Sequence, residues 1–105
     1  MNAEELTGKQ RRYLRGLGVH LKATVFVGSS GITEPLLASV RDAHSNAELI
    51  KVKIERACPL DRKTAGRELA DATASHLVQI LGRTVLLYRA DPDEPVIQLP
   101  ARSGA

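Results

Sequence analysis

A loop bounded by two glycines is the stretch of this sequence best suited to bind an anion. Residues 25–31 read Val-Phe-Val-Gly-Ser-Ser-Gly, so an apolar run stops at Gly28 and a second glycine, Gly31, closes the tetrapeptide. Glycine allows positive φ and lets another backbone approach closely. Only Ser29 and Ser30 lie between the glycines. The loop therefore has room for a phosphate, although a tight turn without a ligand explains the same pattern.

The residues after the loop predict a helix. Thr33 is a favoured N-cap residue, and Pro35 suits the first turn of a helix that begins at Glu34. The N-terminus of a helix carries a partial positive charge and backbone amides that bind phosphate. We therefore predict that free amides point out of the loop toward an anion.

Basic residues are concentrated in the first part of the chain. The 105 residues carry a net charge of +3 and a pI of about 9.4, which permit a polyanionic partner without requiring one. Residues 9–22 contain no acidic residue. The basic residues there are Lys9, Arg11, Arg12, Arg15 and Lys22. A solvated helix face explains these residues, and an anionic partner bound over them is the alternative.

Other reactive side chains give no sign of catalysis. His20, His44 and His76 are far apart and lack the spacing of metal ligands. Cys58 has no histidine near it in the sequence. No Gly-Lys-Ser/Thr follows the glycine loop, so it is not a nucleoside-triphosphate loop. We predict no enzyme activity, no cofactor, no metal and no small-molecule substrate.

Length and composition predict one cytoplasmic domain. The chain has room for one core, and its single cysteine excludes an internal disulfide. Residues 1–5 lack the pattern of a signal peptide, and no apolar run reaches the ~20 residues that span a membrane. We predict a domain over residues 1–99, a flexible tail at 100–105, no contact with a membrane, and a cytoplasmic location.

Capping signals and periodicity predict three helices. Thr7 and Gln10 form a capping box before a helix over residues 8–17. Leu14 and Tyr13 fall on its apolar side, which predicts that both are core residues. The second helix is predicted over residues 34–44 and the third over 62–74.

Strands are predicted at residues 24–27, 49–55, 77–81 and 84–89, with a further short edge strand at 96–99. Lys51 and Lys53 alternate with apolar residues and face one side of their strand, whereas the spacing around Phe26 predicts a core residue. Gly82 and Arg83 join the third and fourth strands in a hairpin. The predicted order α-β-α-β-α-β-β gives an α/β two-layer sandwich with a mixed four-stranded sheet.

Several separated segments together resemble one family. They are Leu21-Lys22, VFVGSSG at 25–31, Ile32-Thr33-Glu34, LIKVKI at 49–54 and LVQILGRTVLLYR at 77–89. In this order they resemble the CRM domain, named for chloroplast RNA splicing and ribosome maturation. As a lone domain the chain is similar to the bacterial YhbY-like proteins, and the similarity covers residues 6–99.

The resemblance implies a fold like the C-terminal domain of translation initiation factor three. It also implies binding of ribosomal RNA in precursors of the large ribosomal subunit. The family's loop corresponds to Gly28, Ser29, Ser30 and Gly31, and its basic first helix to Lys9, Arg11, Arg12 and Arg15. From their positions in the chain, Lys22, Lys51, Lys53 and Arg83 are further candidates to contact RNA.

Two alternatives remain at the level of sequence. One is a protein-interaction adaptor in which the strand from Leu49, or the last strand, offers an edge to a partner. The other is a small enzyme that acts on nucleotides or RNA. Because exposed aromatic residues are not predicted, base stacking is not expected, and we predict recognition of a folded RNA by its shape and phosphates.

Overall fold

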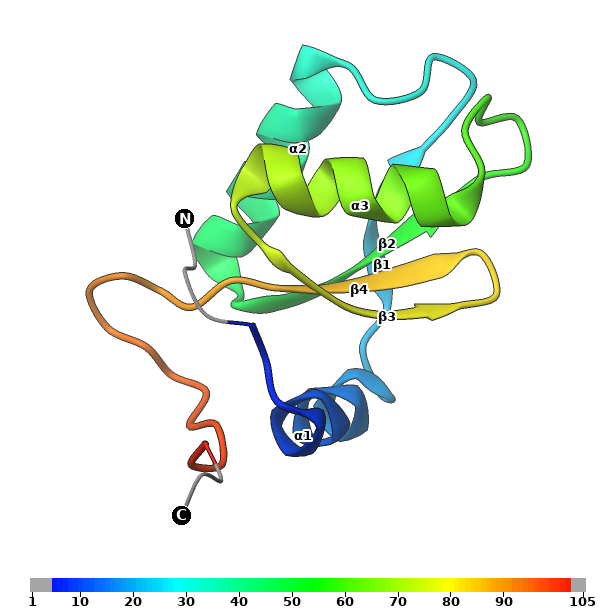
Figure 1. Ribbon diagram of the computed structural model, residues 1–105. Helices are drawn as coiled ribbons and strands as arrows, with labels where there is room; N and C mark the ends of the chain where they lie inside the picture. The colour runs from blue at the N-terminus through cyan, green and yellow to red at the C-terminus, as the bar shows by residue number, and fades with distance from the viewer. Residues whose placement is uncertain (1–4, 103–105) are drawn as a thin grey trace.

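The computed structural model describes residues 5–102, which form three helices and one sheet (Figure 1). The elements are α1 (Gly8–Gly18), β1 (Ala23–Val27), α2 (Glu34–Asn46), β2 (Leu49–Ile54), α3 (Arg62–Thr73), β3 (His76–Leu81) and β4 (Thr84–Tyr88). All seven predicted helices and strands within the α-β-α-β-α-β-β order are present, with boundaries shifted by one or two residues. No helix in this part of the chain is both long and apolar enough to cross a bilayer.

Side-chain caps fix where each helix begins. Thr7 and Gln10 form the predicted capping box of α1, with both hydrogen bonds at 3.0 Å. Thr33 accepts the Leu36 amide at the start of α2, and Asp61 accepts the Thr64 amide at the start of α3. These local bonds satisfy amides that have no partner within the helix.

The sheet is mixed and has the order β1-β2-β4-β3. β1 and β2 are parallel, whereas β4 is antiparallel to both β2 and β3. The predicted α/β sandwich with a mixed four-stranded sheet is confirmed. Because β2 lies between β1 and β4, the strand from Leu49 has no free edge for a partner. Residues 96–99 form no strand, so the predicted last edge strand is wrong.

The main core lies between the sheet and the helices α2 and α3, which cover the same face (Figure 1). Val27, Val52 and Val85 are fully buried there, together with Val40 of α2 and Leu69 of α3. Gly66 allows α3 to approach the sheet, because a Cβ at this position would lie 3.3 Å from side-chain atoms of Leu77 and Val85. Gly66 would weaken an isolated helix, but in this fold it allows α3 to pack closely on the sheet.

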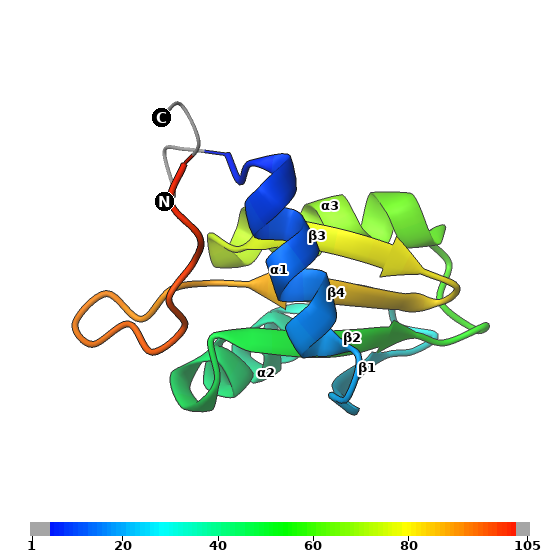
Figure 2. The same cartoon turned by 90° about the horizontal axis from the view of Figure 1, so that it is seen from below.

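Helix α1 lies on the opposite face of the sheet (Figure 2). Leu14 is fully buried against Leu49, Val78, Leu86 and Tyr88. This second core explains why β4 is apolar on both faces, as the sequence indicated. The helix covers part of the face and leaves the part near β1 without a helix over it.

The C-terminal segment returns to the start of the chain. The buried carboxylate of Glu48 accepts hydrogen bonds from the amides of Asp91, Val96 and Ile97, at 2.6–3.1 Å. Further along, Gln10 donates its side-chain amide to the Pro100 carbonyl and Arg102 donates to the Glu5 carbonyl. Pro100 and Arg102 of the predicted flexible tail are thus each joined to the start of the chain by a hydrogen bond, and the flexibility of residues 100–105 stays a prediction. Residues 1–4 and 103–105 lie outside the described part of the chain.

A chain of polar side chains joins the C-terminal ends of α2 and α3. Nε2 of His44 lies 3.0 Å from Oγ of Ser75, and its Nδ1 lies 3.2 Å from the Ala47 carbonyl. Ser75 contacts Oγ1 of Thr73, which donates to the Leu69 carbonyl. Burial lowers the pKa of His44 below its usual 6.5.

The lowered pKa of His44 predicts a loss of stability in mild acid. Below about pH 6.5 the unfolded chain binds a proton at this histidine that the folded chain does not, so the free energy of unfolding falls as the pH decreases. Urea unfolding between pH 7.5 and 5 measures this decrease. The variant His44→Gln is expected to show a smaller decrease than the parent. Equal decreases in both proteins would show that His44 does not contribute.

Gly18 and Gly16 give a matched pair for testing the packing of α1. A Cβ at Gly18 would lie 2.8 Å from a terminal carbon of Leu86, whereas one at Gly16 meets nothing within 4 Å. We expect Gly18→Ala to reduce the free energy of unfolding by ~1–3 kcal/mol through overpacking. Gly16→Ala is expected to raise it by up to ~1 kcal/mol through helix propensity. Thermal or urea unfolding measures both, and a stabilised Gly18→Ala would contradict the close packing.

Candidate nucleic-acid interface

The glycine loop is a closed turn at the end of β1. The Gly31 amide donates to the Gly28 carbonyl at 3.0 Å, and the side chains of Ser29 and Ser30 are exposed. Gly31 has a φ of 68° and requires glycine for this reason, whereas Gly28 does not have a positive φ. A Cβ at Gly28 would lie 3.3 Å from a carboxylate oxygen of Glu55. The two glycines thus have different roles.

Some of the amides that were predicted to face an anion are already paired. The Gly31 amide is used within the turn, and the Leu36 amide is used by the Thr33 hydroxyl. Glu34, an exposed acidic residue, occupies the first turn of α2. The part of the loop that faces solvent is therefore its centre, where Ser29 and Ser30 lie.

Three connecting loops meet at one end of the sheet (Figure 1). The Glu55 amide donates to the Val27 carbonyl at 2.9 Å, which joins the end of β2 to the end of β1. The Ile54 amide donates to the Arg83 carbonyl at 2.7 Å, which joins β2 to the β3–β4 turn. Parallel pairing of β1 and β2 places the starts of α2 and α3 at this end as well.

The cations of α1 do not all have the same surroundings. Lys9, Arg12 and Arg15 are exposed. Nη1 of Arg11 instead donates to the carbonyls of Leu77 and Val78, at 2.6 and 3.2 Å. The register of β3 shifts between Leu77 and Gln79, where these carbonyls lie. Arg11 therefore fastens α1 to β3.

His76 shares this part of the structure with Arg11. Its ring stacks on Tyr88, with centroids 5.9 Å apart. Burial, and then the positive charge of Arg11, lower the pKa of His76 below its usual value. A neutral imidazole next to Arg11 leaves the basic charge of this region to arginine and lysine.

The guanidinium of Arg83 also hydrogen-bonds to backbone carbonyls. It donates through Nε to the Ile54 carbonyl at 2.9 Å and through Nη2 to the Glu55 carbonyl at 2.8 Å. Arg62, the first residue of α3, donates to the Gly82 carbonyl at 2.8 Å. These bonds hold the hairpin turn against β2 and α3, and a contact of Arg83 with RNA stays a prediction.

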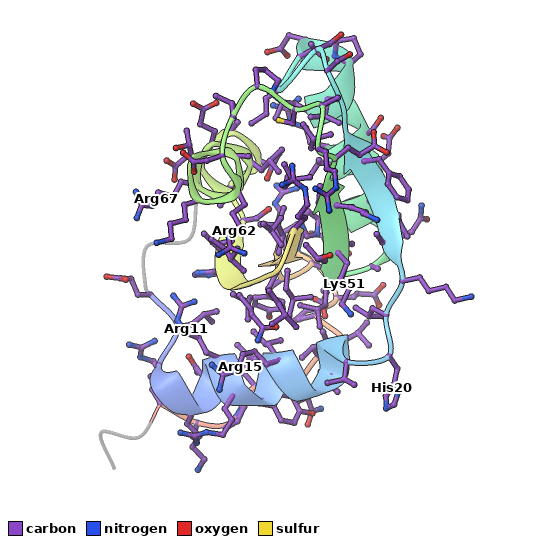
Figure 3. All side chains as sticks on the ribbon, turned by 90° about the vertical axis from the view of Figure 1, so that its right-hand side faces the viewer. Arg11, Arg15, His20, Lys51, Arg62 and Arg67 are labelled. Carbon is purple, nitrogen blue, oxygen red and sulfur yellow. The ribbon has the colours of Figure 1, made fainter. Side chains whose placement is uncertain are left out.

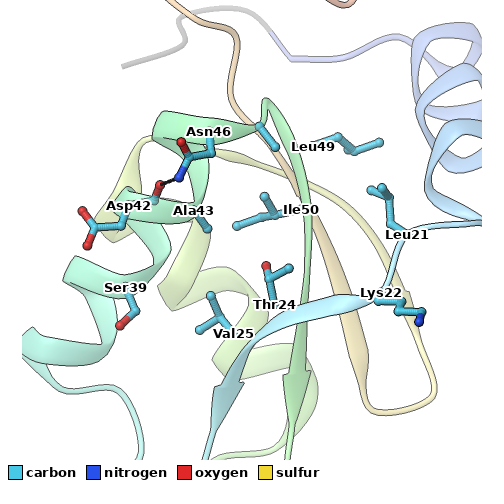
Figure 4. Close-up of a pocket in the computed structure, with 11 residues that line it drawn as sticks. Leu21, Lys22, Thr24, Val25, Ser39, Asp42, Ala43, Asn46, Leu49 and Ile50 are labelled. Atoms are coloured by element: carbon cyan, nitrogen blue, oxygen red, sulfur yellow. Dashed lines mark hydrogen bonds between the residues drawn. The ribbon is translucent and has the colours of Figure 1, made fainter.

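Two of the predicted lysines, Lys51 and Lys53, lie on the α1-facing side of the sheet. Lys53 is exposed and Lys51 is half-buried on β2, and both alternate with the inward-facing Val52. Lys22 precedes β1 at the rim of a largely apolar hollow between α2, β1 and β2, and its ammonium points away from the hollow (Figure 4). The hollow itself offers only Lys22 as a basic group.

The structure adds cations that the sequence interpretation did not name. Figure 3 shows Arg62 and Arg67 of α3 on the same side of the molecule as Arg11 and Arg15 of α1 and Lys51 of β2. Arg56 lies with Lys53 and Arg83 around a shallow polar hollow next to β4. The predicted order of helices and strands could have pointed to these residues. That order places the start of α3 at the same end of the sheet as the hairpin turn.

Two aromatic residues that were predicted to be core are exposed. Phe26 has 51 % of its surface exposed and Tyr13 has 42 %. On β1 the inward positions belong to Val25 and Val27, so alternation places Phe26 on the α1-facing side of the sheet. The apolar contacts of α1 are with β2, β3 and β4, so they do not bury Phe26. The prediction assumed that another element packs over Phe26, but α1 packs on the other three strands.

The remaining reactive groups are accounted for by structure. Among residues 5–102 no cluster of three His, Cys, Asp or Glu side chains could hold a metal ion. Cys58 is buried in the main core. The contact between His44 and Ser75 joins two helices, as described above.

Comparison with known proteins identifies the family. The model of the CRS1/YhbY (CRM) domain matches residues 6–89. The chain belongs to the CRM domain family. It is 35 % identical to a Bacillus subtilis protein named probable RNA-binding protein YqeI, over 90 % of this chain and 99 % of that protein. A Pseudomonas aeruginosa protein also named as a probable RNA-binding protein is 39 % identical, over 83 % of this chain and 84 % of its own length.

A solved structure and a larger plant protein extend the CRM comparison. The solution structure of a Staphylococcus aureus protein, described as a candidate RNA-binding protein, is similar with a TM-score of 0.77 and 38 % identity. It covers 90 % of this chain and 99 % of the other. The CRM-domain containing factor CFM3 of rice, a chloroplastic/mitochondrial protein, is 30 % identical over 74 % of this chain, which corresponds to 9 % of the plant protein.

Arg11 and Arg12 allow the structural and the electrostatic roles of α1 to be separated. Either Arg→Gln change removes one positive charge, but only Arg11 donates to the carbonyls of β3. We expect Arg11→Gln to lower the free energy of unfolding by ~1–3 kcal/mol, since hydrogen bonds from a charged group are lost. Arg12→Gln should change it by less than ~0.5 kcal/mol. Urea unfolding of the two variants measures the difference, and equal stabilities would contradict the fastening role of Arg11.

Proposed function

We propose that this protein is a non-catalytic, cytoplasmic RNA-binding protein that acts in ribosome biogenesis. Its partner is structured ribosomal RNA in precursors of the large subunit. The observation that carries the proposal is the gathering of cations from α1, α3 and β2 on one side of the molecule (Figure 3). Membership of a family whose relatives are named as RNA-binding proteins supports the choice of RNA as the polyanion.

In the proposed complex the glycine loop supplies a further phosphate site. Its exposed serines leave space for a backbone phosphate, with no side chain longer than serine between the glycines. Phosphate contacts fix the position and orientation of a protein on a nucleic acid without reading its sequence. In the proposed complex the loop holds one or two phosphates while Lys9, Arg12 and Arg15 contact others along the RNA.

The proposed partner is folded RNA because most candidate contacts are cations and hydroxyls. Such groups recognise the spacing of phosphates on a rigid RNA shape. The finer assignment, to large-subunit precursors, is supported by the resemblance to YhbY-like proteins described above. A protein of 105 residues that binds by shape would obtain further specificity from neighbouring components of the precursor.

The loop is tested by placing negative charge where phosphates are proposed to bind. The double variant Ser29→Asp, Ser30→Asp should weaken binding to transcribed large-subunit ribosomal RNA by roughly 30-fold, since each carboxylate adds about 1 kcal/mol of repulsion or more. The matched control, Ser39→Asp with Ser45→Asp, adds the same charge on exposed positions of α2 and should retain most of the affinity. Filter binding at fixed salt measures both. Equal affinities of the two double variants would contradict the role of the loop.

Salt dependence tests whether phosphates supply the affinity. With about four to six phosphate contacts, the logarithm of the affinity should fall with the logarithm of the salt concentration at a slope of about −3 to −5. A slope near zero would contradict the electrostatic mode. Sedimentation of cell extract at low magnesium tests the ribosomal assignment, because the parent protein should migrate with large-subunit precursors. If the protein remains with free protein at low salt, that assignment is wrong.

A further inference from the structure

The α1-facing side of the sheet has an uncovered area centred on Phe26. The apolar contacts of α1 on this face are with Leu49, Val78, Leu86 and Tyr88, which belong to β2, β3 and β4. Phe26 lies on the edge strand β1, and half of its surface is exposed. An aromatic side chain is thus held on a strand with half of its surface exposed to solvent.

Two lysines of β2 lie on the same face of the sheet as this ring. Lys53 is the cross-strand neighbour of Phe26 in the parallel pair of β1 and β2, so the two side chains lie side by side about 5 Å apart at the backbone. Lys51 follows on the same strand toward α1, where it lines a groove together with Arg15 and Thr84. Figure 3 shows Lys51 and Arg15 on one side of the molecule, between the sheet and α1.

We propose that Phe26 stacks on an unpaired base of the bound RNA while Lys53 contacts the phosphate next to that base. This proposal rests on the RNA binding proposed above and adds a base-binding position to it. Bases stack on aromatic side chains that a sheet presents, and a neighbouring cation binds the backbone.

The position of Phe26 in the chain connects it to the glycine loop. Only Val27 separates Phe26 from Gly28, so the ring lies roughly 7 Å along the strand from the start of the loop. A segment of RNA whose phosphate lies at Ser29 or Ser30 can therefore place a base on Phe26. Stacking requires that this base be unpaired, because a paired base has its faces covered by its neighbours in the helix.

Charge complementarity favours a nucleotide over an apolar protein segment as the occupant. Single exposed apolar side chains are ordinary on protein surfaces. Phe26 differs because its neighbour on β2 is Lys53, and Lys51 lies two residues further along that strand. A molecule that binds here must therefore combine a flat apolar face with negative charge. A nucleotide has both, whereas an apolar peptide would leave two ammonium groups without a partner.

The experiment compares two hairpin RNAs that differ by a single bulged nucleotide in the stem. Phe26→Leu should weaken binding of the bulged RNA roughly 5- to 150-fold, the loss expected for one base–aromatic contact. Binding of the fully paired RNA and the slope of affinity against salt should not change, because no phosphate contact is removed. Phe26→Tyr retains the ring and should restore affinity for the bulged RNA.

The chain contains no tryptophan, so Phe26→Trp supplies a fluorescent reporter at the proposed site. Saturable quenching by the bulged RNA, with little quenching by the paired RNA, is the expected result. This measurement does not depend on whether Phe26→Leu folds. Val96→Ala, which shortens a side chain with 79 % of its surface exposed, is the control for loss of apolar surface elsewhere.

The outcomes separate the stacking proposal from the proposed function. If the parent binds both RNAs and Phe26→Leu binds the bulged one as tightly as the parent does, stacking is wrong and RNA binding stands. An equal loss of affinity for paired and bulged RNA would also overturn stacking on an unpaired base. If the parent binds neither RNA at low salt, the proposed function fails and the base-binding position fails with it.

Discussion

The need to cover β4 on both of its faces organises this protein. Val85 and Leu87 face α2 and α3, while Leu86 and Tyr88 face the other way, and all four are buried. An apolar strand in the middle of a sheet is stable only if water is excluded from both sides. Helix α1 supplies the second cover through Leu14. The close approach at Gly18 allows it to pack directly on Leu86.

Packing of α1 on the sheet also determines where its charges lie. With the apolar stripe of the helix against β4, Arg12 and Arg15 are left exposed, and Arg15 lies at the groove between α1 and the sheet. Parallel pairing of β1 with β2 brings the glycine loop, the start of α3 and the hairpin turn to one end of the same sheet. The basic side is therefore a consequence of two packing constraints, and its cations come from segments far apart in the sequence (Figure 3).

Helix caps, element order and the layered architecture could be predicted from the sequence, whereas the exposure and the long-range partners of individual side chains could not. The caps at Thr7 and Thr33 depend on residues three positions away, so the starts of the helices were predicted correctly. The exposure of Phe26 depends on where α1 lies relative to β1, which no local pattern encodes. The same reason explains Glu48, whose carboxylate meets amides more than forty positions further along the chain.

The distribution of hydrogen bonds among the arginines shows why net charge alone describes this surface poorly. Arg11 and Arg83 each donate two hydrogen bonds to backbone carbonyls, which fixes their guanidinium groups beside the sheet. Their charges still contribute to the electrostatic potential that attracts a polyanion, but the bound donors are not available to a phosphate. In the proposed complex the direct contacts come mainly from exposed side chains such as Arg12, Arg15 and Lys53. The fold thus separates the cations that hydrogen-bond to the backbone from the exposed cations on which the proposed RNA binding depends.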